Sequence, residues 1–167
     1  MRGLVAAVVT PMNEKGDLNL NLVPKVVDYL ATKGITGIYI AGSTGEGMSL
    51  TDEERREVAE AYVFAAKGRM KSFVQVGHNS LKASADLAGH AEAIGADAVS
   101  ATPTGYFKAS SEAELVEGLL PIAEAASKTP FYYYHIPFLS GVNLDPIKLT
   151  DISMDRLPTF CGIKYSD

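Results

Sequence analysis

Apolar residues follow two alternating patterns along this chain. Short, continuous apolar runs are typical of strands that are buried on both faces. Such runs, and one mostly apolar segment at the end, predict strands at residues 3–9, 35–41, 71–76, 96–102, 130–136 and 160–167. The segments between them repeat apolar residues at every third or fourth position, which predicts amphipathic helices. The predicted order is a strand and a helix, repeated five times and followed by a sixth strand.

The ends of the predicted helices carry recognisable signals. Pro24 suits the first turn of the first helix, and Gly34 suits its stop. Residues 51–54 and 111–114 each have the sequence of a capping box, in which Thr or Ser is followed three positions later by Glu. The predicted helices cover residues 24–34, 51–67, 80–95, 111–126 and 145–152, and the last has the weakest pattern.

The alternation of strands with helices predicts an α/β fold with a parallel sheet, which leaves two architectures open. A doubly wound sheet that binds a dinucleotide carries a G-x-G-x-x-G turn after its first strand, whereas this chain has Thr10, Pro11 and Met12 there. A (β/α)8 TIM barrel carries its chemistry at the carboxyl ends of several strands. The unusual polar residues of this chain follow several strands in this way, so the barrel is favoured.

The length of 167 residues fits one domain but not a complete barrel. An eight-stranded barrel takes about 250 residues, and six strands cannot close into one. Both edges of such a sheet would expose apolar strands. We therefore expect residues 1–167 to be the N-terminal portion, strands 1 to 6, of a single TIM-barrel domain that is truncated after Asp167.

Composition and charge narrow the class of protein. The chain is 47% hydrophobic and 21% charged, as is usual for a soluble globular protein. The net charge of -5 and the lack of a Lys/Arg run argue against a nucleic-acid partner. The single cysteine, Cys161, excludes an internal disulfide, and no His and carboxylate set has metal-ligand spacing. No apolar run has the length of a membrane span and no signal peptide is recognisable, so a cytoplasmic protein is expected.

A lysine near the carboxyl end of the sixth strand is the first candidate for chemistry. Strand alternation places Lys164 on the same side as Phe160 and Gly162. A lysine on a largely apolar strand suits a partly dry pocket, where desolvation favours the neutral, nucleophilic amine. The alternative is a lysine that simply reaches solvent from a strand end.

The segment Gly42–Gly47, after the second strand, has three glycines and two adjacent hydroxyls, those of Ser43 and Thr44. Glycines allow a ligand to approach the backbone, and backbone N–H groups together with hydroxyls can hold a carboxylate. A tight turn without a ligand is the alternative. A phosphate site is disfavoured, because the Gly-Lys-Ser/Thr ending of a P-loop is missing.

Three consecutive tyrosines lie on the fifth strand. Alternation places Tyr132 and Tyr134 on one face, and Tyr133 and His135 on the other. Packing explains Tyr133. Tyr134 lies at the strand end, where its hydroxyl could move a proton to or from a substrate held by Lys164.

Together, residues 42–47, 134–137 and 162–166 resemble the N-acetylneuraminate lyase and dihydrodipicolinate synthase superfamily, in order and in spacing. The resemblance implies a (β/α)8 barrel, a homotetramer, and a class I aldolase that acts on pyruvate-derived substrates with no metal or other cofactor.

The same resemblance implies roles for individual residues. Lys164 matches the lysine that forms a Schiff base with the substrate, and Tyr134 matches the tyrosine that transfers a proton. Ser43 and Thr44 match the pair that binds the keto-acid carboxylate. Ser166 matches a hydroxyl that contacts the substrate.

Leu139 and two short segments bear on the branch of the superfamily. Dihydrodipicolinate synthases usually have an arginine where this chain has Leu139, and an apolar side chain cannot pair with a second carboxylate. Residues 136–141 and 164–167 resemble the neuraminate lyase branch, which implies cleavage of N-acetylneuraminate to N-acetylmannosamine and pyruvate. A dihydrodipicolinate synthase, a 2-keto-3-deoxy sugar-acid aldolase and a non-catalytic keto-acid-binding relative remain alternatives. Tyr106 resembles the inter-subunit tyrosine of the family, although Thr104 and Gly105 depart from the usual loop.

Overall fold

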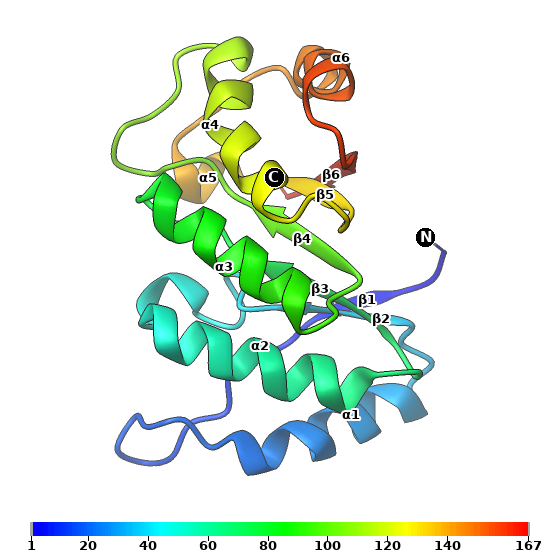
Figure 1. Cartoon of the computed structure of the whole chain (residues 1–167). Coiled ribbons are helices and arrows are strands. Elements are labelled where there is room, and N and C mark those ends of the chain that lie inside the picture. Colours follow the sequence, from blue (N-terminus) through cyan, green and yellow to red (C-terminus); the bar gives the residue numbers. More distant parts are fainter. Residues whose placement is uncertain (1, 167) are drawn as a thin grey trace.

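The computed structural model describes residues 2–166, which form one parallel sheet with its helices packed beside one another (Figure 1). The six strands lie side by side in the order of the sequence, and each pairs in parallel with the next. The strands are β1 (Val5–Ala7), β2 (Gly37–Ile40), β3 (Lys71–Gln75), β4 (Ala98–Ala101), β5 (Phe131–His135) and β6 (Phe160–Tyr165). The predicted strands and their parallel order are confirmed. Within residues 2–166 the outer edges of β1 and β6 are unpaired. The sequential order of the strands fits the predicted TIM barrel and differs from a doubly wound sheet, in which the order reverses.

Each longer helix follows one strand and packs beside the next helix (Figure 1). These helices are α1 (Val23–Thr32), α2 (Asp52–Ala66), α3 (Leu81–Ala93), α4 (Glu112–Ala125) and α6 (Pro146–Arg156). The last one is longer than predicted, since it continues beyond Ile152 to Arg156. A short helix that was not predicted, α5 (Pro137–Ser140), follows β5, and 3-10 turns form at η1 (Leu20–Leu22) and η2 (Gly47–Ser49).

Only one of the two predicted capping boxes is complete. At the start of α2, Thr51 Oγ1 accepts from the Glu54 amide at 3.2 Å, and the Glu54 carboxylate accepts from the Thr51 amide at 2.8 Å. At α4, Ser111 caps the helix in the same way, but the prediction of a reciprocal bond is wrong. The Glu114 carboxylate instead accepts from the amide and hydroxyl of Ser110, at 2.7 and 2.8 Å. Ser110 offers two hydrogen-bond donors to this carboxylate, whereas the backbone of Ser111 offers one.

The sheet separates two groups of buried side chains. The larger group fills the space between the sheet and the helices and includes Phe131 and Tyr133 of β5. A smaller, mainly aromatic group lies on the other, inner face. Its members are Tyr39, Phe73, Ala98, Tyr134 and Ile136, with Tyr132 packed against them. The alternation predicted for the three tyrosines is therefore confirmed.

A bulge changes the alternation of β6. Phe160 pairs with Phe131, but the next residue of β5, Tyr132, pairs with Gly162, so that Cys161 is an extra residue. Phe160 consequently packs into the helix-facing core, while Lys164 pairs with Tyr134 at the inner face. The prediction that Phe160 shares a side with Lys164 is wrong, because one extra residue reverses the faces of a strand.

The first strand is shorter and more exposed than predicted. Continuous burial was expected over residues 3–9, but only Val5–Ala7 forms a strand, and Leu4 and Val9 are 67% and 51% exposed. The cause is the position of β1 at an edge of the described sheet, where only β2 covers it.

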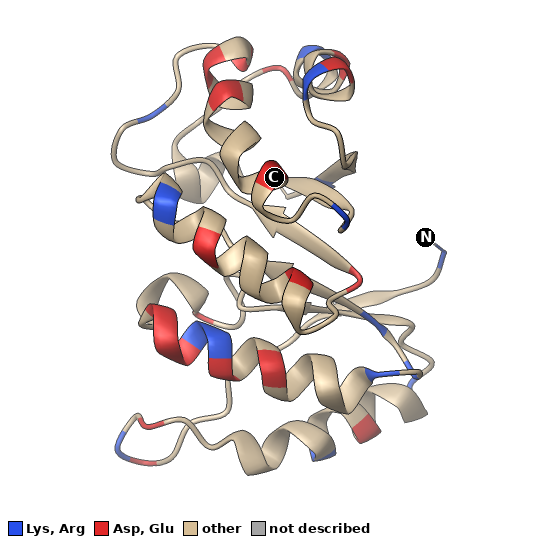
Figure 2. Ribbon diagram, viewed as in Figure 1, with Lys and Arg blue, Asp and Glu red and all other residues tan. Residues whose placement is uncertain are grey.

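Charged side chains of both signs are interspersed along the helices and loops (Figure 2). No helix within residues 2–166 is long and apolar enough to cross a membrane.

Candidate active site

Lys164 lies on the inner face near the carboxyl end of β6. Its side chain is partly buried, and its Nζ lies 3.4 Å from the centroid of the Tyr134 ring and 5.0 Å from that of Tyr39. The amine also donates to Ser166 Oγ at 3.2 Å. These contacts turn the amine toward neighbouring strands, so the pocket interpretation is favoured over a lysine that extends freely into solvent.

Tyr134 is the closest partner of that amine. Its side chain is only 4% exposed, and its hydroxyl lies 3.4 Å from Ser43 Oγ, the length of a weak hydrogen bond. Burial by itself would raise the pKa of the Tyr134 hydroxyl. The adjacent Lys164 and the Ser43 hydroxyl outweigh burial, so the pKa of Tyr134 lies below its ordinary value of 10.0. A lowered pKa makes this phenol a better proton carrier near neutral pH.

The loop after β2 is strained and tightly packed. Ala41 and Glu46, on either side of Gly42 and Gly45, have positive φ values of 54° and 53°. Such backbone costs about 1–3 kcal/mol at a residue other than glycine. Contacts within the loop enforce it, since a Cβ at Gly47 would lie 1.9 Å from the Ala41 carbonyl oxygen. The loop is therefore a rigid turn as well as a candidate binding site, and the two interpretations are compatible.

Thr10, directly after β1, anchors the same loop. Its buried hydroxyl donates to the Gly45 carbonyl at 2.6 Å. The anchored turn leaves the side chains of Ser43 and Thr44 exposed, next to the end of β5. Thr44 makes no side-chain hydrogen bond to residues 2–166, so its hydroxyl is available for a ligand.

The structure thus brings four of the predicted site residues into one group, namely Lys164, Tyr134, Ser43 and Ser166. Tyr106 is not part of this group. It lies in the loop between β4 and α4, where its side chain is 80% exposed and its ring packs edge-on against Phe107.

Tyr39 is a member of the site that was not predicted. It lies on β2, its ring meets that of Tyr134 edge-on at 5.5 Å, and its hydroxyl donates to Ser100 Oγ at 2.9 Å. A single tyrosine in an otherwise aliphatic strand, just before the Gly42–Gly47 loop, was the available signal.

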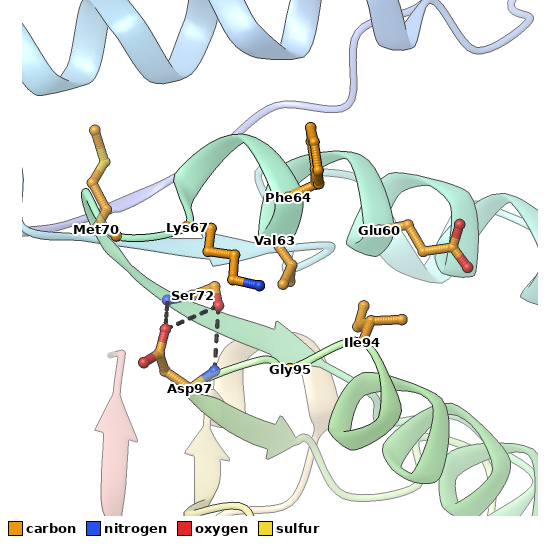
Figure 3. A pocket seen from close by; sticks show the side chains of 10 residues that line it. Glu60, Val63, Phe64, Lys67, Met70, Ser72, Ile94, Gly95 and Asp97 are labelled. Carbon is orange, nitrogen blue, oxygen red and sulfur yellow. Dashed lines mark hydrogen bonds between the residues drawn. The ribbon is translucent and has the colours of Figure 1, made fainter.

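The inner face carries a hollow of about 390 Å³ beside this group, with Tyr39 and Lys164 in its wall. A hollow of about 470 Å³ lies elsewhere, between α2 and the amino ends of β3 and β4 (Figure 3). The Asp97 carboxylate there is already paired with Lys71 Nζ and with the amide and hydroxyl of Ser72. The second hollow therefore offers few free polar groups and lies at the opposite end of the strands from Lys164.

Metal ligands do not gather at this site. Within the described part of the chain, no three His, Cys, Asp or Glu side chains are arranged to hold a metal ion. The groups that are present, an amine, a phenol and hydroxyls, suit covalent and proton-transfer chemistry on a carbonyl compound.

Comparison with known proteins agrees with this geometry. Over its full length the chain is 43% identical to the N-acetylneuraminate lyase of Homo sapiens, of which it covers 53%. The solved N-acetylneuraminate lyase of Proteus mirabilis is 34% identical, with a TM-score of 0.97, and the chain covers 56% of it. A sialic acid aldolase of Ruminococcus gnavus, solved as a catalytic lysine mutant, is 32% identical, with a TM-score of 0.90 over 99% of this chain and 53% of that one.

The chain thus spans about half the length of the relatives it matches. The family model described as "Dihydrodipicolinate synthetase family" matches residues 1–166, which is nearly the whole sequence. This chain, in which the Lys164 amine lies beside Tyr134 and the Ser43 loop on six strands of a TIM-barrel sheet, thus belongs to the dihydrodipicolinate synthetase family.

Proposed function

We propose that the whole protein is an N-acetylneuraminate lyase, a class I aldolase that cleaves this sialic acid to N-acetylmannosamine and pyruvate. The observation that carries the proposal is the position of Lys164 Nζ, 3.4 Å from the Tyr134 ring, with the Tyr134 hydroxyl adjoining Ser43. The identity of 43% to the human N-acetylneuraminate lyase supports the choice of substrate. The Ruminococcus gnavus protein, whose name records a catalytic lysine, supports the role of the amine.

The first step is attack by the neutral Lys164 amine on the C2 ketone of the open-chain sugar acid. The hydroxyl of the carbinolamine gains a proton from the solvent and leaves as water, so that a protonated imine remains between Nζ and C2. Ser43 and Thr44, with the amides of their loop, hold the substrate carboxylate, because both hydroxyls are exposed beside the end of β5. Ser166, which accepts from Nζ at 3.2 Å, orients the amine.

The second step breaks the bond between C3 and C4. Tyr134 takes the proton of the C4 hydroxyl, the C4 oxygen becomes the aldehyde of N-acetylmannosamine, and the electron pair of the bond moves to the imine. Protonation of the resulting enamine at C3 and hydrolysis of the imine release pyruvate and free Lys164. The lowered pKa of Tyr134 favours its part in this transfer.

Leu139 separates this proposal from dihydrodipicolinate synthesis. It lies on α5, immediately after β5, where its side chain is 59% exposed. A second carboxylate would find no cation at this position. A non-catalytic keto-acid-binding role is the other alternative, and the presence of both Lys164 and Tyr134 argues against it.

Borohydride trapping on the full-length protein tests the proposal. With pyruvate, we expect a reduced adduct on Lys164 by mass spectrometry, and none in Lys164→Ala. A substrate panel then distinguishes the reactions, and N-acetylneuraminate should be turned over in preference to aspartate semialdehyde with pyruvate. A label on another residue, or no label on the intact protein, would refute the imine mechanism.

We also propose a domain organisation, a cellular location and an oligomeric state for the protein. Residues 1–167 form strands 1 to 6 of a single barrel domain, since six sequential parallel strands leave two open edges. We expect a cytoplasmic homotetramer, with the neighbouring exposed rings of Tyr106 and Phe107 at a contact between subunits. Light scattering on the full-length protein measures the oligomeric state, and a monomer at micromolar concentration would contradict this expectation.

A further inference from the structure

We propose that Tyr39 is a positioning residue whose ring, together with that of Tyr134, forms a seat for the nitrogen of Lys164 and for the imine formed there. The inference rests on the proposed function and adds a residue to it.

The seat is built from strands that are distant in the sheet. Lys164 Nζ lies over the Tyr134 ring of β5 at 3.4 Å and over the Tyr39 ring of β2 at 5.0 Å. The two rings meet edge-on, with an interplanar angle of 77°. A cation within about 6 Å of a ring centroid is attracted by the electron-rich face of that ring. The amine therefore has an aromatic wall on two sides.

The Tyr39 ring is held firmly in this orientation. Its hydroxyl donates to Ser100 on β4, and both side chains are buried. The backbone of Gly42 covers part of the ring, since a Cβ at that position would lie 2.7 Å from ring atom Cε1. A ring that is fixed by a buried hydrogen bond and by close backbone packing can orient a flexible lysine side chain.

The hydroxyl of Tyr39 has a different role from that of Tyr134. Burial raises the pKa of Tyr39 far above its ordinary value, so this phenol keeps its proton. Its hydrogen bond to Ser100 also holds it away from the amine. Tyr39 is therefore suited to positioning and not to proton transfer.

The chemistry of an imine explains why such a seat is useful. The positive charge that the amine carries as an ammonium returns to the same nitrogen when the imine is protonated. Ring faces that attract a cation stabilise the protonated imine, which must accept the electron pair when the carbon–carbon bond breaks. Relative to the neutral amine that attacks the ketone, loss of one ring should destabilise the protonated imine by roughly 3- to 30-fold; relative to the ammonium the effect largely cancels.

Fluorinated phenylalanine at position 39 of the full-length protein tests this inference without changing the size of the ring. Tyr39→Phe keeps the ring and should form the pyruvate imine within about 3-fold of the wild type. Tyr39→3,4,5-trifluorophenylalanine withdraws electrons from the ring face. At subsaturating pyruvate, and at a pH high enough for the free amine to be neutral, it should lower the trapped imine by a further 3- to 30-fold. The same fluorination at Phe131, which is buried in the helix-facing core, is the matched control and should have no effect on trapping.

If the Tyr39 ring had only a packing role, fluorination should not change trapping, because it alters the electron density of the ring and scarcely its shape. Equal trapping in Tyr39→Phe and its fluorinated counterpart, with equal melting temperatures, would overturn the inference. An equal loss in the Phe131 control would overturn it as well.

A second measurement separates this inference from the proposed function. Acetylation of Lys164 by acetic anhydride, followed by mass spectrometry, needs no substrate. If Tyr39 holds the charged amine, acetylation should be several-fold faster in the fluorinated variant than in Tyr39→Phe. A wild-type protein that forms no imine would refute the proposed function, and the acetylation rates would then support or refute the seat on their own.

Discussion

Tyr134→Phe tests the division of roles between the phenol and the amine, because it removes one hydroxyl and keeps the ring. The ring makes the contacts with Lys164 and Tyr39, and these remain. The hydroxyl loses its contact with Ser43, which at 3.4 Å is long for a hydrogen bond between hydroxyls, and its interactions with Lys164 and Ser166. We therefore expect the free energy of unfolding to fall by less than about 1 kcal/mol.

The effect on cleavage should be much larger. A positioned acid–base group contributes about 10²–10⁴-fold to rate, so kcat should fall by that factor, equivalent to roughly 3–5 kcal/mol in the activation free energy. Imine formation with pyruvate should fall far less, since Lys164 keeps its contact with the ring. In the wild type, kcat should rise with pH as Tyr134 loses its proton, below the ordinary value of 10.0, and this rise should be missing in the variant.

The measurement combines pyruvate release, borohydride trapping and thermal melting on the full-length protein. Tyr133→Phe is the matched control, because it removes the neighbouring hydroxyl on the opposite face of β5. That hydroxyl has no hydrogen-bond partner among residues 2–166, so kcat should not change. A folded Tyr134→Phe with the wild-type kcat would remove Tyr134 from the mechanism, as would an equal loss in the control.

Three further changes test the local structure by thermal or denaturant unfolding. Asp97→Asn should lower the free energy of unfolding by about 1 kcal/mol at pH 7, because hydrogen bonds and Lys71 lower the pKa of Asp97 in the folded state. The difference in stability between wild type and variant should shrink as the pH falls below 3.8. An equal difference at pH 7 and pH 3 would contradict this reasoning. Gly47→Ala should cost more than about 2 kcal/mol and reduce turnover, because its Cβ would lie 1.9 Å from the Ala41 carbonyl oxygen. Gly118→Ala in α4 should instead stabilise by about 0.5–1 kcal/mol, since no atom beyond the neighbouring residues and the backbone of its own helix lies within 4 Å of its new methyl group. Equal effects of the two alanines would show that packing at Gly47 is not the cause.

Most of the fold could be predicted because local patterns and tertiary packing agree. The apolar runs became parallel strands, and the faces of Tyr133 and Tyr134 followed from alternation. Features that depend on competition between neighbours were missed. The Glu114 carboxylate had two possible partners, and the sequence pattern could not show that Ser110 offers more donors than Ser111.

Only some residues of the candidate site could be predicted from the sequence, for a similar reason. Lys164, Tyr134 and the Ser43 loop lie at strand ends, where a parallel barrel gathers functional groups. Tyr39 joins them through contacts that cross the inner face, to Tyr134, Ser100 and Lys164. Such contacts depend on the curvature of the sheet, and neither spacing nor composition encodes that curvature directly.

The bulge in β6 divides that strand into two halves of opposite phase. A regular strand with Phe160 turned toward the helices would turn Lys164 the same way, into the aliphatic core. The extra residue, Cys161, instead lets the first half serve packing while the second half presents the amine at the inner face. The side of the sheet on which the amine lies is thus decided by the number of backbone residues in the strand. A point substitution can weaken or remove this amine, but carrying it across the sheet takes an insertion or a deletion.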